Sequence, residues 1–238
     1  MSLALEIKNV SFAYSNQLIL DNVSLSIDAG HFVGIIGPNA GGKTTFFKLL
    51  LGLLDPLEGK IRLLGKKPKV FAHIGYVPQF NQLDPKFPIT VKELILLGAV
   101  RDEGWCYSYS KKIQEKANEL MEMFGLTRHQ DKRYSDLSGG FKQRALFAKS
   151  LMVEPQILIL DEPTANMDRP SKKKFFDLLC QFKGNKTILM VDHDIDNLSK
   201  YATKLLLVDN TISEITQESI CHHQQVGSYH TDEALQHG

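Results

Sequence analysis

The sequence has few cysteines and no long apolar run. Cys106, Cys180 and Cys221 are odd in number and lie far apart, without the spacing of a zinc site or a disulfide framework, so we expect a reducing compartment. No stretch approaches the ~18 uninterrupted apolar residues that would span a bilayer. The first ten residues, MSLALEIKNV, lack the charged and then apolar pattern of a signal peptide. We therefore expect a soluble chain that reaches a membrane only through a partner.

An excess of charge of one sign is also missing. The chain has 28 Lys and Arg residues against 27 Asp and Glu residues, which gives a formal net charge of +1. Because binding to a phosphate backbone needs a basic surplus, we expect no nucleic-acid partner. The apolar content of 43% in 238 residues is ordinary for a folded protein and sufficient for a sizeable core.

Short apolar runs predict an α/β fold. Buried strands are expected at 31–36, 73–77, 157–160, 187–191 and 205–208, and alternating patterns in 3–14 and 22–27 predict half-exposed strands. Helical spacing of apolar residues in 91–97 and 111–124 predicts a helical insertion. We therefore expect one domain over 1–220. Its parts are a core of 1–85 and 145–220, a helical subdomain at about 86–144, and a polar His-containing tail at 221–238.

The stretch GPNAGGKTT, residues 37–45, follows an expected buried strand and leads into an expected helix at 44–54. It fits the pattern G-x-x-x-x-G-K-[ST], in which glycines let backbone N–H groups converge on phosphate oxygens at the positive end of a helix. Lys43 would reach the β- and γ-phosphates of ATP, and the Thr44 hydroxyl would ligate Mg²⁺. A chance match in a glycine-rich turn is the alternative. The other expected ATP contacts in this loop are Gly37, Pro38, Asn39, Ala40, Gly41, Gly42 and Thr45.

Residues 157–162, ILILDE, end a buried strand in two carboxylates. In open α/β folds nucleotides bind at the carboxyl ends of the strands, where these acids would lie. Asp161 would hold the Mg²⁺ shell, and Glu162 would polarise the attacking water as general base. A strand-to-turn boundary with two solvated acids is the alternative.

A second turn, Ser138-Gly139-Gly140, opens an expected helix and offers another anion site made of backbone N–H groups. One protein seldom needs two phosphate cradles for one nucleotide. A head-to-tail dimer would explain both, because each chain's second cradle would then close over the γ-phosphate held by its partner. A plain helix N-cap at Ser138 is the alternative.

Together these motifs resemble those of the ATPase subunits of ABC transporters. The matching segments are Walker A at 37–45, the Q-loop at Gln79, the signature at 137–140, Walker B at 157–162, the D-loop at 165–168 and the switch histidine at His193. The resemblance implies a P-loop NTPase (ABC ATPase) core with an N-terminal antiparallel β subdomain and an inserted helical subdomain. It also implies Mg²⁺-dependent ATP hydrolysis in a homodimer.

The resemblance implies roles for four further residues. Gln79 would touch Mg²⁺ or the attacking water, and Asp168 would cross the dimer interface. His193 would hydrogen-bond the γ-phosphate and hold Glu162 and Asp168, and Tyr14 would stack on adenine. Taken alone, His193 would be an ordinary loop histidine and Tyr14 a core aromatic.

Two positions depart from the family pattern. Phe141 stands where the signature usually continues with Gln, so a side-chain amide is lost while the backbone N–H groups remain. Ala40 stands where Gly is usual. If residue 40 needs φ > 0, Ala costs about 1 kcal/mol; Gly41 taking up that conformation is the other outcome.

Residues 80–91, FNQLDPKFPITV, are similar to a stretch in ATPases of zinc and manganese importers. This similarity implies an integral membrane permease, an extracytoplasmic metal-binding protein, and a location on the cytoplasmic face of the inner or plasma membrane. The alternative is that this stretch is a loop followed by an N-cap at Thr90, ahead of the expected helix at 91–97. Rival functions are import of an iron chelate, siderophore or cobalamin, or a soluble cassette acting on ribosomes or DNA.

The tail contains a histidine cluster at 222, 223, 230 and 237 beside Cys221. Such a cluster could bind a transition metal, and a polar tail without a ligand is the alternative.

Overall fold

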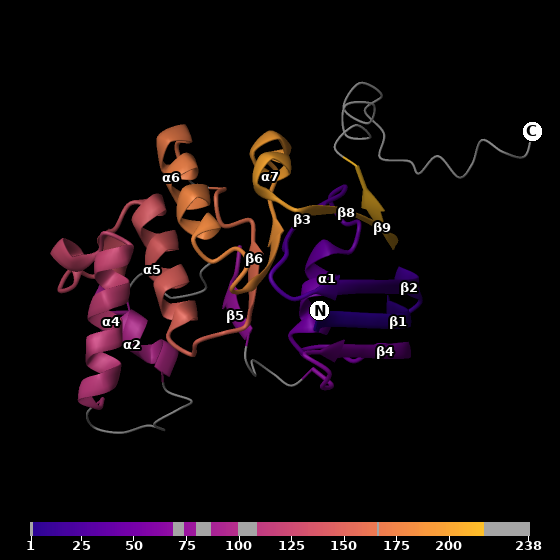
Figure 1. The fold of residues 1–238 in the computed structure, drawn as a ribbon, viewed down its shortest axis with the longest axis horizontal. Coiled ribbons are helices and arrows are strands. Elements are labelled where there is room, and N and C mark those ends of the chain that lie inside the picture. Colours follow the sequence, from indigo (N-terminus) through magenta and orange to yellow (C-terminus); the bar gives the residue numbers. More distant parts are fainter. Residues whose placement is uncertain (1, 69–73, 80–86, 100–108, 166, 217–238) are drawn as a thin grey trace, which may run out of the picture.

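The computed structural model describes residues 2–68, 74–79, 87–99, 109–165 and 167–216 (Figure 1). In chain order the elements are β1 (Leu3–Tyr14), β2 (Gln17–Asp28), β3 (Phe32–Ile36), α1 (Lys43–Leu50), β4 (Glu58–Leu63), β5 (Ile74–Val77), α2 (Val91–Leu96), η1 (Leu97–Ala99), α4 (Lys111–Met123), η2 (Thr127–His129), η3 (Tyr134–Asp136), α5 (Gly139–Leu151), β6 (Ile157–Asp161), α6 (Arg169–Cys180), β7 (Thr187–Val191), α7 (Ile195–Tyr201), β8 (Lys204–Asp209) and β9 (Thr211–Ile215). Within these ranges, every helix is too short or too polar to cross a bilayer.

The central sheet has the strand order β5-β6-β7-β3-β8-β9. Its strands are parallel except for β9, which pairs antiparallel with β8. Every residue of β3, β6 and β7 is buried, because both faces of this sheet are covered. The expected buried strands are confirmed, and their carboxyl ends meet along one edge.

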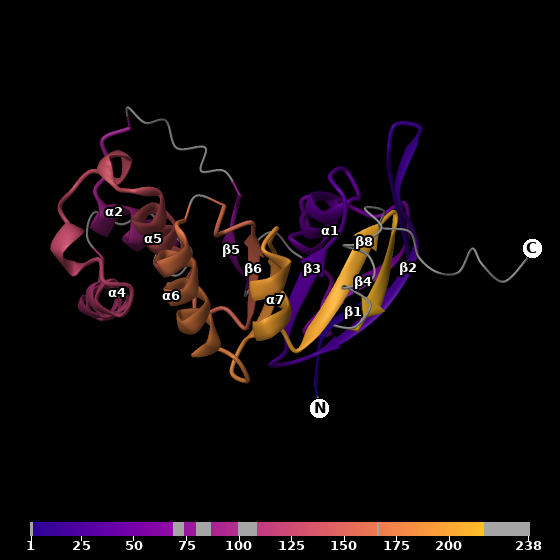
Figure 2. The same cartoon turned by 90° about the horizontal axis from the view of Figure 1, so that it is seen from above.

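A second sheet, of order β2-β1-β4, is antiparallel, as the family resemblance implied for the N-terminal part. The helix α1 packs between the two sheets, where Phe46 and Phe47 share one apolar cluster with Val33 and Ile35 of β3. Phe32 belongs to the opposite cluster, since successive strand residues point to opposite faces. Figure 2 shows α1 between β3 and the antiparallel sheet.

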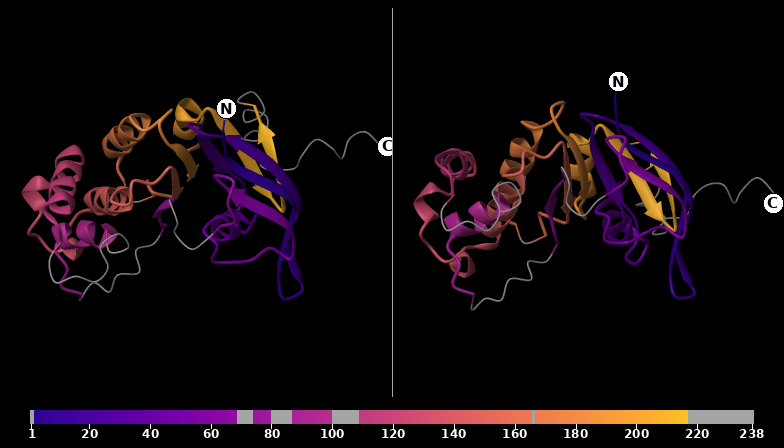
Figure 3. Two further views of the ribbon diagram at one scale, coloured as in Figure 1. Left: turned by 60° about the horizontal axis from the view of Figure 1, so that its bottom comes forward. Right: turned by 90° about the horizontal axis from the view of Figure 1, so that it is seen from below.

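The helices α2, α4, α5 and α6 lie at the other end of the molecule from the antiparallel sheet, as further views confirm (Figures 1 and 3). Phe147 of α5 packs against Phe124, the C-cap residue of α4, and against Phe175 of α6, with ring centroids 5.1 and 5.5 Å apart. The helix α5 runs unbroken across residue 145, where the boundary between core and helical subdomain was predicted. That boundary therefore falls inside a helix that packs on both parts.

The ends of two helices follow from local chemistry. The helix α1 stops at Leu50, four residues before the predicted end, because Gly52 takes a left-handed conformation (φ 68°) and its N–H binds the carbonyl of Leu49. Thr90 caps α2 in a capping box with Glu93, so the N-cap of the alternative interpretation is present, and it is compatible with the similarity to importer ATPases. The predicted tail at 221–238 and residues 80–86 of the importer-like stretch lie outside the described residues.

Candidate functional site

The phosphate loop follows β3 and passes close to the end of β8. A Cβ atom on Gly37, whose φ is 150°, would lie 2.0 Å from the carbonyl oxygen of Val208. A Cβ atom on Gly41 would lie 2.7 Å from the same oxygen. Both approaches are closer than a side chain tolerates, so these glycines are required by packing as well as by the path of the loop.

Ala40 adopts the left-handed conformation, with φ 66°, and Gly41 does not have a positive φ. The alternative in which Gly41 takes over that conformation is therefore wrong. The physical reason is that Gly41 is bonded on both sides: its N–H donates to Pro38 and its carbonyl accepts from Asn210. Ala40 thus carries a strain of about 1 kcal/mol.

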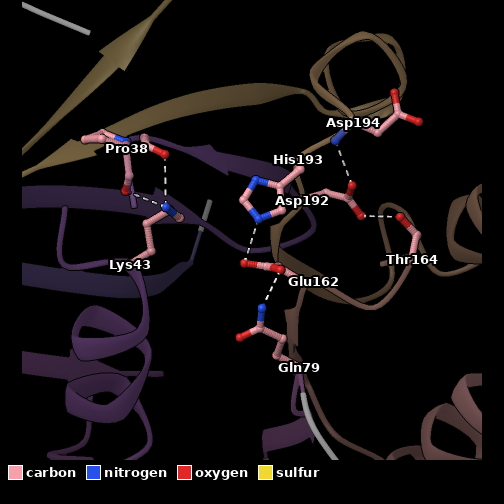
Figure 4. Close-up of polar contacts among 9 residues, drawn as sticks. Pro38, Lys43, Gln79, Glu162, Thr164, Asp192, His193 and Asp194 are labelled. Atoms are coloured by element: carbon pink, nitrogen blue, oxygen red, sulfur yellow. Dashed lines mark hydrogen bonds and ion pairs between the residues drawn. The ribbon is translucent and has the colours of Figure 1, made fainter. Parts of the chain in front are cut away.

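Lys43 begins α1 and is only 8% exposed. Its Nζ donates to the carbonyls of Gly37 at 2.9 Å and Pro38 at 2.7 Å, so the ammonium is held across the loop (Figure 4). Burial lowers the pKa of Lys43, and the negative charges of Glu162 and Asp161 oppose that shift. A desolvated cation in this position interacts strongly with an added anion.

Asp161 ends β6 and is 3% exposed. Burial, and then the neighbouring charge of Glu162, raise the pKa of this carboxyl from 3.8 to about 6, although Lys43 and Lys48 act in the opposite direction. Tyr76 lies on the adjacent strand β5, where burial and the Asp161 charge raise its pKa to about 12. The edge of the sheet therefore holds a carboxylate that water solvates poorly.

The Glu162 carboxylate joins the ends of three neighbouring strands. Gln79, which follows β5, donates its Nε2 to Glu162 Oε2 at 2.5 Å. His193, which follows β7, places its Nε2 3.0 Å from Glu162 Oε1 (Figure 4). Glu162 itself has a left-handed backbone (φ 47°), fixed by the bond from its N–H to the carbonyl of Val191 at 2.9 Å. This strained turn directs the side chain toward both donors.

The oxygen-rich residues beside Lys43 suit a magnesium ion. Asp161 supplies a buried carboxylate, and Thr44 supplies an exposed hydroxyl in the first turn of α1. Among the described residues, no group of three or more His, Cys, Asp or Glu side chains is placed to hold a metal. Mg²⁺ does not need such a group, because it typically binds one or two carboxylates together with substrate phosphates and water. Gln79, predicted to touch Mg²⁺, donates its amide nitrogen to Glu162, so its amide oxygen is the atom of this side chain that could contact the ion.

The turn formed by Ser138, Gly139 and Gly140 does not join this site within one chain. The helix α5, which starts at this turn, is separated from α1 by β5 and β6 in two perpendicular views (Figures 1 and 2). Ser138 is exposed and is the N-cap residue of α5, but its side chain makes no capping bond to that helix. Phe141 packs its ring against His129, at a centroid distance of 4.5 Å, and beneath the Arg144 guanidinium.

Tyr14 and Asp168 are accessible. Tyr14, which is 42% exposed, lies edge-on to Phe12 at a centroid distance of 4.9 Å. The partner of Phe12 in β2 is Leu20, whose side chain approaches Gly42. Tyr14 is two residues beyond Phe12 in β1. It therefore lies about 7 Å along the strand from the place where Leu20 meets the phosphate loop. Asp168 is the N-cap residue of α6, and a hydrogen bond with Ser171 holds the pKa of its exposed carboxyl below the ordinary value.

Sequence reasoning missed a polar contact behind His193. The buried Thr164 hydroxyl donates to Asp192 Oδ2 at 2.6 Å. In the sequence, the only indication of this contact is the charged residue Asp192, which directly follows a buried strand in VDHD.

Comparisons with known proteins agree with this geometry. A family model described as "ABC transporter" matches residues 20–165. The chain belongs to the ABC transporter family. It is 39% identical to a Chlamydia muridarum protein named "Probable metal transport system ATP-binding protein", over 90% of this chain and 92% of that one. It is 33% identical to the "Zinc uptake system ATP-binding protein ZurA" of Listeria innocua, over 89% of this chain and 85% of that one.

A solved structure extends the comparison. The dimeric structure of an ATP-binding cassette bound to ADP and Pi matches with a TM-score of 0.76 and 26% identity, over 89% of this chain and 98% of that one. The P-loop ABC fold predicted from the motifs is confirmed. As a member of the ABC transporter family, the chain binds ATP and hydrolyses it for transport.

Replacing Asp161 by Asn should stabilise the ABC cassette. The buried carboxylate opposes folding above the ordinary pKa of 3.8, and this penalty grows until the pH passes the folded-state pKa of about 6. In buffer without nucleotide and Mg²⁺, Asp161→Asn should therefore raise the free energy of unfolding by about 3 kcal/mol near pH 7.5, and by clearly less near pH 4.5. Urea unfolding at both pH values measures the difference.

The control is Asp131→Asn, which changes an exposed carboxyl and should alter stability little at either pH. A variant at Asp161 that is less stable than the native chain near pH 7.5, or whose gain does not depend on pH, contradicts the electrostatic account.

Proposed function

We propose that this chain hydrolyses ATP to drive import of a divalent metal ion, zinc or manganese, through a separate membrane permease. The observation that carries the hydrolytic part is the Glu162 carboxylate bonded to both Gln79 and His193 beside Asp161 and Lys43. The metal is supported by the importer-like stretch at 80–91 and by the names of the relatives from Chlamydia muridarum and Listeria innocua.

Binding of ATP depends on the phosphate loop. Lys43 already carries its ammonium beside the loop carbonyls, and β- and γ-phosphate oxygens would replace these carbonyls as its partners. Apart from Pro38, which has no N–H, the remaining loop residues from Gly37 to Thr45 would offer backbone N–H groups, assisted by the positive end of α1. The exposed ring of Tyr14 would stack on adenine.

Asp161 and the Thr44 hydroxyl are the residues that would hold Mg²⁺, with the Gln79 amide oxygen as a third donor. When bound, this ion neutralises charge that develops on the phosphate oxygens. The raised pKa of Asp161 also means that its carboxyl is about half ionised near pH 6 before the ion binds.

Glu162 would act as general base. It would accept a proton from the water that attacks the γ-phosphorus, while the bond to the β-phosphate oxygen breaks. Gln79 and His193 fix the two carboxylate oxygens, so the base is oriented before substrate arrives. With its ring partly exposed, His193 would also hydrogen-bond the γ-phosphate.

A second copy of the chain would complete the site. The turn at Ser138, Gly139 and Gly140 faces solvent on the part of the chain remote from α1, so it would meet the γ-phosphate held by a partner subunit. Asp168 would lie at the same interface. The homodimer would work on the cytoplasmic face of the inner or plasma membrane, with an integral permease and an extracytoplasmic metal-binding protein.

The variant Glu162→Gln should bind ATP without turning it over. Loss of the base should lower kcat by about 100-fold or more, and ATP should then hold the two copies together as a dimer. Phosphate release measures turnover, and size-exclusion chromatography with ATP and Mg²⁺ measures the dimer. Glu119→Gln, at an exposed position of α4, is the matched control and should behave as the native chain does. Native turnover in Glu162→Gln would show that the base has been assigned wrongly.

The transported substrate is tested in the complete transporter. We expect Zn²⁺ or Mn²⁺, supplied with the extracytoplasmic binding protein, to stimulate ATP hydrolysis by the complex in liposomes and to accumulate inside. Iron siderophores and cobalamin are the comparison substrates, and stimulation by one of them alone would overturn the metal-ion assignment. Recovery of the native chain with ribosomes and without any integral membrane protein would favour the soluble cassette.

A further inference from the structure

The loop that carries His193 is bonded to its surroundings by groups on both sides of the histidine. Asp192 follows the last residue of β7 and is 5% exposed, whereas 60% of the His193 side chain is exposed. Asp192 Oδ2 accepts from the Thr164 hydroxyl at 2.6 Å, and Asp192 Oδ1 accepts from the Asp194 N–H at 2.9 Å (Figure 4). The Asp192 side chain is therefore held inside the protein, whereas the neighbouring His193 side chain projects toward solvent.

The buried contact runs beside the functional one. Glu162 and Thr164 belong to the segment after β6, and Asp192 and His193 belong to the segment after β7. The Thr164–Asp192 bond joins the same two segments as the Glu162–His193 contact of 3.0 Å. Because an exposed ring with one contact to Glu162 is poorly restrained by itself, the buried bond determines where the loop holds that ring.

Holding a loop with a buried carboxylate costs free energy. An ionised group taken out of water is costly unless hydrogen bonds compensate it, and a neutral acceptor would avoid that cost. The two bonds that Asp192 accepts come from a hydroxyl and a backbone amide, and charged acceptors make such bonds shorter and stronger than neutral ones. The carboxylate thus gives the loop a rigid anchor where Glu162 requires an accurate partner.

On the other side of His193, Asp194 connects the loop to α6. It caps α7 by accepting from the Asn197 N–H and amide at 3.2 and 2.9 Å. It also lies 3.7 Å from the Lys172 ammonium, and the Lys172 N–H donates to the carbonyl of Asp168 at 2.9 Å. The loop of His193 is therefore connected to the first turn of α6, whose N-cap residue is Asp168.

We propose that Asp192 is a positioning residue for ATP hydrolysis: with Thr164 it anchors the loop that presents His193 to Glu162, and Asp194 with Lys172 braces that loop against α6. This inference rests on the proposed roles of Glu162 and His193 in hydrolysis and does not depend on the transported substrate. It assigns a function to Asp192, Thr164 and Lys172, to which sequence reasoning gave none.

The experiment uses the full chain and measures kcat and KM for ATP together with the melting temperature. Asp192→Asn keeps the shape of the side chain and an acceptor oxygen for the Asp194 N–H, but it replaces the charged acceptor of the Thr164 hydroxyl by a neutral amide, which makes that contact weaker. It should lower kcat by about 10- to 100-fold, because a small displacement of a positioned group has effects of that size, and it should change KM less than about 2-fold. Thr164→Val should give the same pattern from the other side of the bond, and Thr164→Ser, which restores the hydroxyl, should recover most of kcat.

Combined variants separate positioning from a merely structural role. Asp192→Asn with Thr164→Val should lose no more kcat than Thr164→Val alone, since both changes act on the same Thr164–Asp192 contact. Asp192→Asn should also have little further effect when His193→Ala is present, because it acts through that ring. Lys172→Met should lower kcat by a smaller factor, about 2- to 5-fold, as expected for a weaker and partly exposed ion pair. Lys173→Met is its control and should leave kcat unchanged, because Lys173 is exposed on the same turn.

Native kcat in Asp192→Asn and in Thr164→Val would overturn the proposal, and so would an equal loss of kcat in the presence and absence of His193→Ala. Failure of the underlying function has a different signature. In that case His193→Ala or Glu162→Gln would itself keep native turnover, whatever the result for Asp192.

Discussion

The site depends on one carboxylate that is bonded from two directions. Glu162 receives Gln79 from the end of β5 and His193 from the end of β7, while it follows β6, the strand between them. Parallel pairing aligns these three strand ends at a single edge, so groups separated by 83 residues in the chain come within hydrogen-bond distance. The Glu162 backbone takes a left-handed conformation to meet them. Its orientation is thus a property of the whole sheet.

Function in this site opposes stability. Asp161 and Lys43 are both buried, and their desolvation shifts each pKa toward the neutral form. Ala40 and Glu162 both hold left-handed backbones that other residues would adopt more easily. The apolar clusters on the two faces of the central sheet stabilise the fold by more than these features destabilise it. Concentration of strain and buried charge at one edge is typical of a preorganised catalytic site.

Much of the fold could be predicted because its strands are short apolar runs that end in functional residues. The strands β3, β6 and β7 were recognisable for this reason, and the loop after β3 by its glycines. The end of α1 was predicted too late, because the left-handed turn at Gly52 is decided by local backbone bonds rather than by the apolar pattern. The domain boundary at residue 145 was drawn through α5, since one helix can pack on two parts and its pattern does not mark the border.

Parts of the site could not be predicted from the sequence. Residue 40 rather than Gly41 takes the left-handed conformation, because contacts with Val208 and Asn210 constrain Gly41, and both come from the far end of the chain. The Thr164–Asp192 bond spans 28 residues and joins two side chains that no local pattern pairs. The side chain of Ser138, which sequence alone allowed as an ordinary N-cap, proved to make no capping bond.

The central claim is that each ATP site is built from Lys43 of one chain and the Ser138 turn of another. Mixing two variants that we expect to be inactive on their own, Lys43→Ala and Ser138→Arg, tests it most directly. In a mixed dimer one site carries both defects and the other carries none, so ATP hydrolysis should return on mixing. Random pairing sets the limit at about a quarter of the native rate if the two sites work independently. Absence of any recovery, although the two variants form mixed dimers, would contradict a shared site and show that each chain completes its own.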